Sequence, residues 1–302
     1  MTFAVIVTYN RKVLLEKSIR MLLRQTRPFD RIIIVDNHSV DGTQDMLRQK
    51  GWITSPFQYI YTQKNIGGAG GFCLGIKTAY EEGADWIVLM DDDGCPADEN
   101  TFSELMNTAD QMLRTNTCDG KLFINCLVAE SSLLSFKLGK LYTVEEAIRA
   151  EKNGIIPNEA NPFNGTAISR KLVDAIGFPN ADFFIKGDEV DYKLRASDAG
   201  AFICTVINAR FNHPRPETKE KTVLGVKVPF SVEAPWKEYY TARNFTYMYK
   251  QKKQYKAIAF EIIFVKLLAV LQTKCNKYLT IRMMLKGVAD GWMGKMGPRI
   301  LP

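Results

Sequence analysis

Blocks of apolar residues alternate with amphipathic stretches over the first 90 residues of this chain. Continuous apolar runs at residues 2–8, 31–35, 57–61 and 86–90 have the length and composition of strands that are buried on both faces. Between these runs, apolar residues recur with helical spacing. Strands that alternate with helices predict βαβ units, and therefore a parallel sheet with helices on its faces.

The clearest helical pattern lies between the first two strands. Asn10 stands where it can cap a helix, and Pro28 ends the helical segment. The stripe that would face the sheet, at spacing i, i+4, i+7 and i+8, consists of Leu15, Ile19, Leu22 and Leu23. Two more helices are predicted near residues 42–50 and from the glycine-rich stretch to about residue 82.

The second half of the chain gives weaker structural signals. We expect short helices at residues 171–176 and 190–199 and a strand at residues 201–206. Residues 130–160 carry few signals and predict a mobile or inserted loop. The fold class is therefore α/β, with a mostly parallel, Rossmann-like sheet covered by helices on both faces.

Three consecutive carboxylates, Asp91, Asp92 and Asp93, follow the fourth predicted strand and precede Gly94. Adjacent carboxylates repel one another unless a cation lies among them. Oxygen ligands at the carboxyl end of a strand suit Mg²⁺ or Mn²⁺, which also gather substrate phosphates. The alternative is a solvated acidic turn, because Asp and Gly are ordinary turn residues.

Other polar residues gather at the same predicted edge, where ligands of open α/β sheets bind. Thr8, Tyr9 and Asn10 end the first strand, and Asp36 ends the second. Asp36 can accept a hydrogen bond from a ribose or a nucleobase, or it can serve as a turn residue or helix cap. His38 is expected to be a solvated turn residue.

A glycine-rich loop follows the third strand, with Asn65 before Gly67, Gly68, Gly70 and Gly71. A dinucleotide-binding fingerprint would open directly from the first strand, so this placement argues against a dehydrogenase. Four glycines allow the backbone to approach a ligand closely, and the next helix offers its N-terminus. A purely structural turn remains the alternative.

Composition limits the class of protein. An apolar share of 46% and a charged share of 24% are those of a globular chain with a full core. The six scattered cysteines form no C-x-x-C pair, which favours free thiols in a reducing compartment. We expect no signal peptide, because residues 3–7 already belong to the first strand.

The charge is unevenly distributed. From Arg210 onward the chain has 18 Lys and Arg against 6 Asp and Glu, a net charge of +12, whereas the preceding residues carry a net −5. Such a basic tail suggests an anionic partner. The apolar block at residues 257–271, interrupted by Glu261 and Lys266, is too short and too polar to span a bilayer. It is either a buried helix or an interfacial helix on anionic lipid.

Four motifs in order resemble those of the family 2 glycosyltransferases, which have the GT-A fold. They are Val7-Thr8-Tyr9-Asn10-Arg11, Val35-Asp36-Asn37, Asn65-Ile66-Gly67-Gly68-Ala69-Gly70-Gly71-Phe72 and Met90-Asp91-Asp92-Asp93. The glycine-rich motif is most similar to that of the galactofuranosyltransferase branch. Residues 183–192, His213 and residues 236–244 resemble later segments of that branch, so the resemblance covers residues 1–250.

The resemblance implies a UDP-sugar donor, Mn²⁺ or Mg²⁺, and inversion at the anomeric carbon. It also implies a nucleotide-sugar-binding half at about residues 1–125 and an acceptor-binding half at about residues 126–250. The lysines and the apolar block beyond Tyr249 separately predict a helical basic extension at residues 251–302. The implied metal ligands are Asp91, Asp93 and His213. The implied donor-binding residues are Thr8, Tyr9, Asn10, Arg11, Asp36, Asn65, Gly67, Gly68, Gly70, Gly71, Asp91 and Asp92. The implied acceptor-binding residues are Asn164, Gly165, Thr166, Trp236, Arg243 and Asn244.

The catalytic base is expected in the pair Asp188-Glu189. A sugar hydroxyl is a poor nucleophile, so a carboxylate must take its proton. The resemblance favours Glu189 and leaves Asp188 to cap the helix or bind the acceptor; alternatively, both residues only cap that helix. The branch usually has Asp where Glu189 stands. This chain is also far shorter than the polymerising members, so processive synthesis is not implied.

The sequence therefore favours galactofuranose transfer from UDP-galactofuranose to a hydroxyl of a cell-surface glycan or lipid-linked saccharide. Rhamnosyl or other hexosyl transfer is the alternative reaction, and a non-catalytic nucleotide-sugar-binding protein is the alternative class. We expect a cytoplasmic protein at the inner face of the membrane, in peripheral contact with anionic lipid. No nucleic-acid-binding motif is present, and self-association is compatible with the sequence.

Overall fold

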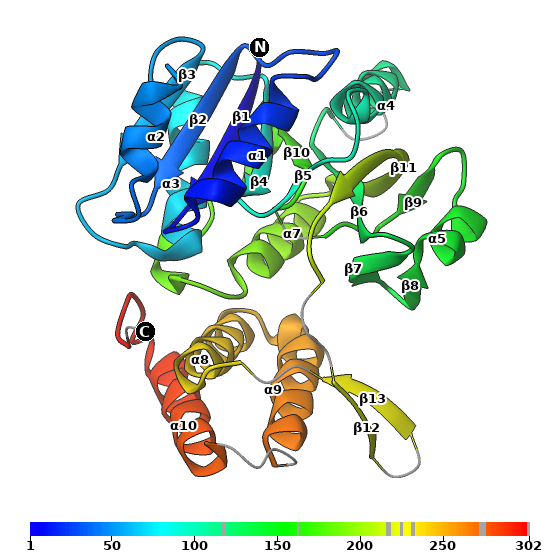
Figure 1. The fold of residues 1–302 in the computed structure, drawn as a ribbon. Helices are drawn as coiled ribbons and strands as arrows, with labels where there is room; N and C mark the ends of the chain where they lie inside the picture. Colours follow the sequence, from blue (N-terminus) through cyan, green and yellow to red (C-terminus); the bar gives the residue numbers. More distant parts are fainter. Residues whose placement is uncertain are drawn as a thin grey trace. The chain divides into compact units, whose positions relative to one another are not determined.

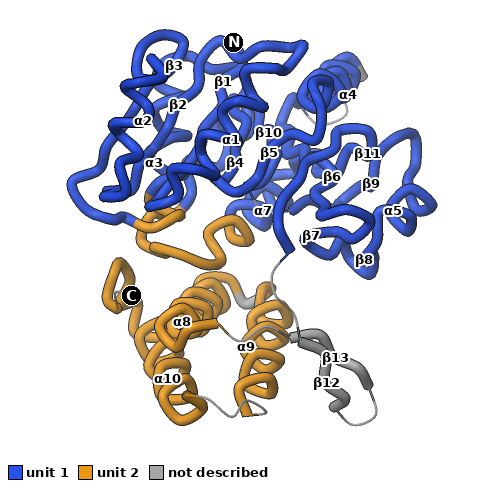
Figure 2. The backbone as a smooth tube through the Cα atoms, viewed as in Figure 1, with its two compact units in different colours: residues 1–66, 71–179, 192–215 blue, residues 67–70, 180–191, 216–302 orange. Residues whose placement is uncertain are grey.

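The computed structural model describes residues 1–115, 119–161, 163–215, 219–223, 226–230, 233–271 and 276–300. The chain folds into two compact units, drawn in two colours in Figure 2. The first contains residues 1–66, 71–179 and 192–215, and the second contains residues 67–70, 180–191 and 216–302. Each unit is described by itself. The domain boundaries expected from the sequence stay a prediction.

The first unit is built on an 11-stranded sheet, and its first four strands are parallel in the order β3-β2-β1-β4 (Figure 1). These four strands confirm the four apolar runs of the sequence. Their bounds are Thr2–Thr8 for β1, Arg31–Asp36 for β2, Phe57–Tyr61 for β3 and Trp86–Asp91 for β4. In this register Val7 pairs with Asp91, and Thr8 pairs with Asp36, so the polar strand ends meet at one edge.

The sheet continues beyond β4 in mixed orientation. β10 lies antiparallel between β4 and β6, and β11 runs parallel to β6. The remaining strands of this sheet are β5 (Cys95–Pro96), β6 (Leu122–Glu130), β7 (Leu133–Leu138), β8 (Leu141–Thr143), β9 (Ile155–Pro157), β10 (Thr166–Ser169) and β11 (Phe202–Asn212).

Helices cover both faces of this sheet, because successive residues of a buried strand point to opposite sides. Ile6 packs in one cluster with residues of α1 (Lys12–Leu22), α2 (Thr43–Gln49) and α4 (Thr101–Thr115). Its neighbour Val5 packs in the other cluster with α3 (Gly67–Glu81), α6 (Arg170–Ile176) and α7 (Asp188–Asp198). The expected fold class is confirmed.

Several local expectations were wrong. Arg11, rather than Asn10, occupies the N-cap position of α1, and Leu23 lies outside the helix and is exposed. Residues 130–160 do not form a loop. They contain β7, β8, β9 and α5 (Val144–Ala150), which share a small core with Leu127 and Ile207. The capping box of α5, formed by Thr143 and Glu146, marks this regular structure in the sequence.

The second unit is largely helical. It contains α8 and, within the predicted extension at residues 251–302, the helices α9 and α10. α10 packs so closely on α8 that a Cβ at Gly287 would lie 2.3 Å from the carbonyl oxygen of Tyr239. The elements are η1 (Ala181–Phe183), β12 (Lys219–Val223), β13 (Val226–Phe230), α8 (Pro235–Gln251), η2 (Lys253–Tyr255), α9 (Lys256–Leu271) and α10 (Lys277–Met293).

Two further expectations from the sequence concern the cysteines and the apolar helices. Among the described residues, Cys73, Cys95, Cys126 and Cys204 form no disulfide bond, whereas Cys118 and Cys275 lie outside the described residues. Within the described ranges, no helix is long and apolar enough to cross a membrane.

Candidate active site

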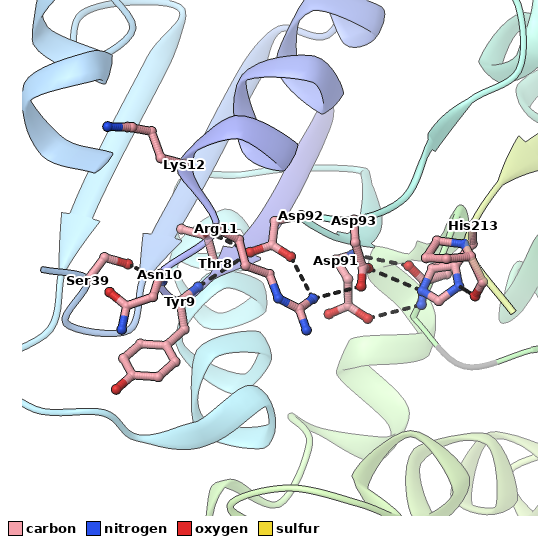
Figure 3. A network of polar contacts seen from close by, with 12 residues as sticks. Thr8, Tyr9, Asn10, Arg11, Lys12, Ser39, Asp91, Asp92, Asp93 and His213 are labelled. Atoms are coloured by element: carbon pink, nitrogen blue, oxygen red, sulfur yellow. Dashed lines mark hydrogen bonds and ion pairs between the residues drawn. The ribbon is translucent and has the colours of Figure 1, made fainter. Parts of the chain in front are cut away.

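The acidic triplet lies where β4 ends, at the carboxyl edge of the parallel strands. Asp91 is the last residue of β4, and His213 directly follows β11. One ligand atom each from Asp91, Asp93 and His213 lies within 4.8 Å of the other two (Figure 3). The chain thus brings together, from two strands far apart in sequence, the three residues expected to bind metal.

The imidazole of His213 is oriented by its backbone surroundings. Its Nδ1 lies 2.7 Å from the carbonyl oxygen of Pro214, so a proton on Nδ1 donates there and leaves the lone pair of Nε2 facing the carboxylates. Nε2 is 3.2 Å from Asp93 Oδ1. This contact lacks hydrogen-bond geometry, because buried Oδ1 has no hydrogen-bond partner among the described residues. His213 Nε2 and Asp93 Oδ1 are two electron-pair donors that lie side by side, so both can bind the same cation.

The charge of the site fits a divalent ion. Arg11 Nη1 lies 2.7 Å from Asp93 Oδ2 and 3.2 Å from Asp92 Oδ1. Three carboxylates and one guanidinium leave two negative charges when His213 is neutral. A divalent cation among oxygen and imidazole ligands neutralises them, and both Mg²⁺ and Mn²⁺ suit carboxylate-rich ligand sets. The residues present therefore fit the ion that the fold family implies.

Asp92 organises the loop after β1. Its Oδ2 accepts a hydrogen bond of 2.7 Å from the Thr8 hydroxyl and one of 3.4 Å from the Tyr9 backbone. Asp92 and Thr8 are buried, whereas Tyr9 is exposed. The middle acid of the triplet thus fixes the loop on which Tyr9 and Arg11 stand.

Asn164 holds Asp91 in place through two hydrogen bonds. Its Nδ2 donates to Asp91 Oδ2 at 3.0 Å, and its Oδ1 accepts from the Asp91 backbone at 3.2 Å. Asn125 in turn donates to the carbonyl oxygens of Asn164 and Gly165 and, at 2.9 Å, to the Thr166 hydroxyl. Thr166 has no exposed surface, and Asn164 is 3% exposed. These contacts make Asn164 a support of Asp91, and the acceptor-binding role expected for residues 164–166 stays a prediction.

Sequence reasoning missed the part played by Asn125. The signal was available, because a lone amide interrupts the apolar run of β6 and a buried polar group needs partners. The amide joins Asn161 to Thr166, since its Oδ1 accepts from the Asn161 backbone at 2.9 Å.

Burial and mutual repulsion shift the titration of the triplet. Burial, reinforced by the charges of Asp93 and Asp92, raises the pKa of Asp91 to about 7. Burial also raises the pKa of Asp92 to about 6. Against the effect of burial, contacts with His213 and Arg11 lower the pKa of Asp93, and Asp93 raises the pKa of His213.

The loops after β1 and β2 are joined by hydrogen bonds between backbone N–H groups and side-chain oxygens. Asn10 has a positive φ of 54°; its backbone donates to the Ser39 hydroxyl, and its Oδ1 accepts from the Val40 backbone, both at 2.8 Å. Asp36 is fully buried, with Ser39 N and the Tyr59 hydroxyl as its donors at 2.8 Å. The turn role of Asp36, left open by the sequence, is therefore present in the structure.

His38, in the same turn, is not simply solvated. It is half-buried, and its Nδ1 lies 3.2 Å from the carbonyl oxygen of Thr62.

The glycines expected in a loop belong to the first turns of α3. A Cβ at Gly71 would lie 2.6 Å from Val7 Cγ1, so this glycine permits close packing of α3 on β1. A Cβ at Gly67 would lie 2.0 Å from the carbonyl oxygen of Phe184. Among the described residues, a Cβ at Gly68 would meet no atom within 4 Å. Gly68 is thus the glycine whose surroundings leave room for a ligand; Gly70 is buried, and Asn65 is half-buried.

The remaining predicted residues belong to the second unit. Asp188 and Glu189 open α7; Asp188 is 5% exposed, and Glu189 is half-buried. Trp236 is half-buried and packs edge-on against Tyr240, with ring centroids 6.3 Å apart. Arg243 and Asn244, predicted to bind the acceptor, have no exposed surface.

The fold and this site together are those of a GT-A glycosyltransferase. The model of the family "Glycosyl transferase family 2" matches residues 3–163, and the chain belongs to this family. It is therefore an enzyme that transfers a sugar.

Three similar proteins illustrate the relationship. The galactofuranosyltransferase GlfT1 of Mycolicibacterium smegmatis is 31% identical over 256 residues, which cover 82% of each chain. The dTDP-rhamnosyl transferase RfbF of Shigella flexneri is 21% identical over 98% of this chain and 96% of its own. The solved structure of the mannosyltransferase PcManGT from Pyrobaculum calidifontis, in complex with GDP-Man and Mn²⁺, has a TM-score of 0.58 at 14% identity. It covers 97% of this chain and 87% of that one, and at this identity it supports the fold alone.

Proposed function

We propose that this protein is an inverting, metal-dependent galactofuranosyltransferase that uses UDP-galactofuranose. The observation that carries the metal dependence is the group Asp91, Asp93 and His213, with its orphaned carboxylate oxygen and oriented imidazole. The choice of sugar is supported by the 31% identity to GlfT1 over 82% of both chains. Rhamnosyl transfer is the second candidate, supported by the similarity to RfbF over nearly the whole chain.

In this proposal, the residues around β1 and β4 bind the donor. A divalent cation held by Asp91, Asp93 and His213 would offset the charge that develops on the leaving diphosphate. Arg11, Tyr9 and Gly68 lie on loops or helix turns that leave them accessible to the nucleotide sugar. Asn164, which donates to the Asp91 carboxylate, would keep that ligand oriented toward the ion.

Glu189 serves as the general base. It takes the proton of the acceptor hydroxyl as the acceptor oxygen forms its bond to the anomeric carbon. The bond between that carbon and the diphosphate oxygen breaks on the opposite side, so the configuration inverts and UDP leaves. Half-buried Glu189 has the exposure that a base needs, whereas buried Asp188 is suited to capping α7.

We further propose that the acceptor is presented at an anionic membrane surface, on the cytoplasmic side. The spacing of Tyr278, Leu285 and Trp292 places them on one stripe of α10, and they are 83%, 66% and 56% exposed. Arg282 stands on the same stripe, and the whole C-terminal part is basic. Exposed aromatic and basic residues together favour an interfacial contact.

The test is an assay of UDP release with a panel of nucleotide sugars and lipid-linked saccharide acceptors, with products identified by mass spectrometry. We expect release with UDP-galactofuranose and acceptor together, loss of activity in EDTA, and recovery with Mn²⁺ or Mg²⁺. Turnover of a dTDP-sugar alone would favour the rhamnosyl alternative. Full activity in excess EDTA would exclude the metal, and nucleotide-sugar binding without turnover on any acceptor would indicate a binding protein.

A further inference from the structure

The segment that precedes α7 has an unusual backbone. Phe184 and Lys186 have positive φ angles of 64° and 68°, and Gly187 has 87°. Side-chain-bearing residues rarely adopt this conformation, and it persists only where the surroundings over-determine it. The segment leads directly into Asp188 and Glu189, so whatever holds it also sets the position of the proposed base.

Two neighbouring side chains of α8 hold this segment. The Nη2 atom of Arg243 lies 3.0 Å from the carbonyl oxygen of Asp182 and 2.9 Å from that of Phe183. The Nδ2 atom of Asn244 lies 3.0, 2.9 and 2.7 Å from the carbonyl oxygens of Phe183, Ile185 and Lys186. These bonds satisfy the carbonyl groups that the irregular backbone leaves without helical or strand partners.

The two side chains are themselves fixed. Arg243 Nε donates to Asn244 Oδ1 at 2.8 Å, and the guanidinium lies 4.6 Å from the centre of the Tyr240 ring. Arg243 has no exposed surface, and this burial lowers its pKa. Burial of a charged side chain costs free energy. A buried guanidinium that contacts backbone carbonyl groups therefore indicates a function in positioning that backbone.

The C-terminal residues complete the arrangement. Arg243 Nη1 donates to the carbonyl oxygen of Gly297 at 2.5 Å, and the Gly297 backbone donates to the carbonyl oxygen of Asp182 at 2.8 Å. The Tyr240 hydroxyl donates to the carbonyl oxygen of Ile300 at 3.0 Å and accepts from the backbone of Arg299 at 3.0 Å. The end of the chain is thereby tied to the same segment.

We propose that Arg243, Asn244 and residues 297–300 form a clamp that positions Glu189 for proton transfer. This inference rests on the proposed role of Glu189 as base. Arg243 and Asn244 act through the backbone of residues 182–187, so they are positioning residues. The C-terminal segment accordingly contributes to turnover as well as to membrane contact.

A double-mutant cycle tests the clamp. Asn244→Ala removes the donor to three carbonyls, and it should lower kcat about 10-fold to 100-fold while the affinity for UDP, measured by calorimetry, stays constant. In the Glu189→Gln background the same change should lower kcat by less than about threefold, because groups that act as a unit are not additive. The matched control is Thr246→Ala on the same helix, whose hydroxyl donates to the Ala242 carbonyl; it should leave kcat within about twofold in both backgrounds.

The outcomes separate the clamp from the base. An equal loss of kcat from Asn244→Ala in both backgrounds overturns the clamp and leaves Glu189 as the base. A Glu189→Gln enzyme with the wild-type rate overturns the proposed base, and the clamp falls with it. If Asn244→Ala does not fold, Tyr240→Phe replaces it, since it removes one hydroxyl and keeps the ring. It should lower kcat about threefold to tenfold with unchanged UDP affinity, and a wild-type kcat there overturns the role of the C-terminal residues.

Discussion

At the scale of single residues, the base assignment is the most exposed claim. Glu189→Gln keeps the shape and hydrogen bonding of the side chain but cannot accept a proton. Turnover should fall by about 10²–10⁴-fold, the usual contribution of general base catalysis. The affinity for UDP should hardly change, because the loss is confined to the transition state. Steady-state kinetics with saturating donor and acceptor measure kcat, and calorimetry measures UDP binding.

Asp188→Asn is the matched comparison for Glu189→Gln. It should affect stability or the KM for acceptor more than kcat, because buried Asp188 lies at the start of α7, where a carboxylate can cap the helix. An inactive Asp188→Asn enzyme beside a fully active Glu189→Gln enzyme would reverse the two roles. If both variants remain active, neither residue is the base.

The metal ligands should give the site a pH dependence of its own. Asp91, whose pKa burial raises to about 7, carries a proton below that pH, and the proton competes with the ion. The affinity for Mn²⁺ should therefore fall by at least about tenfold for each unit of pH below 7, because His213, whose pKa Asp93 raises, is also protonated there, and it should change less above pH ~7. Calorimetric titration with Mn²⁺ at several pH values from about 5.5 to 8 measures this affinity.

Two variants serve as controls for the predicted pH dependence of Mn²⁺ binding. Asp93→Ala should bind Mn²⁺ weakly at every pH while the protein remains folded, because it removes the orphaned oxygen beside His213. Asp45→Asn, an exposed carboxylate in the first turn of α2, should behave as the wild type. An affinity that does not change between pH 8 and pH 6 contradicts the role of Asp91 as a ligand.

Residue types at strand ends predicted which carboxylates and imidazole come together in the Asp91, Asp93 and His213 group, because a sequence shows which acids stand together. Whether a polar residue contacts a ligand or supports another residue depends on its burial, which one sequence does not reveal. Thr166 and Arg243, assigned to the acceptor on resemblance, have no exposed surface, and their role in acceptor binding stays a prediction. Asn125 escaped notice because its partners, Asn161 and residues 164–166, are distant in sequence and meet it only in the fold.

At the scale of secondary-structure elements, α3 offers a test of what its glycines do. A Cβ at Gly75 would lie 2.3 Å from Val5 Cγ1 and 3.3 Å from Val35 Cγ2, so Gly75→Ala overpacks the junction of α3 with the sheet. We expect a loss of about 1–3 kcal/mol in the free energy of unfolding, measured from the urea midpoint.

Gly68→Ala is the control with open space around its Cβ. Since Ala favours a helix over Gly by about 1 kcal/mol, the urea midpoint should stay constant or rise. The affinity for UDP should nevertheless fall, because the methyl group occupies room that we assign to the donor. Unchanged UDP affinity would remove Gly68 from the donor site, and an unchanged midpoint for Gly75→Ala would contradict the close packing.

The sequence predicted correctly those elements whose pattern of apolar residues is clear and uninterrupted. The runs that became β1 to β4 are apolar throughout and end at turn residues, so both their type and their bounds were visible. Residues 130–160 were missed because β7, β8 and β9 are short and part of their core comes from Leu127 and Ile207 in other elements. Tertiary contacts of this kind leave little local signal.

At the scale of the whole molecule, we propose two roles for the C-terminal residues, one in turnover and one in membrane contact. Truncation after Lys250 would remove Gly297 and Ile300 together with the exposed stripe of α10, so it cannot separate turnover from membrane contact. Point substitutions on the exposed stripe can, because they leave the bonds of Arg243 and Tyr240 in place.

Leu285→Ser with Trp292→Ser should weaken binding to vesicles that contain anionic phospholipid by about tenfold or more, since each side chain would bury apolar surface worth about 1.5–3 kcal/mol. Vesicle sedimentation measures the binding, and added salt should weaken it further because the basic residues contribute. The affinity for UDP should not change. Leu113→Ser on α4, an equally apolar and 41% exposed position of the first unit, should bind vesicles as the wild type does. If the wild-type protein ignores anionic vesicles, or if the double variant binds them equally well, the stripe of α10 serves another contact.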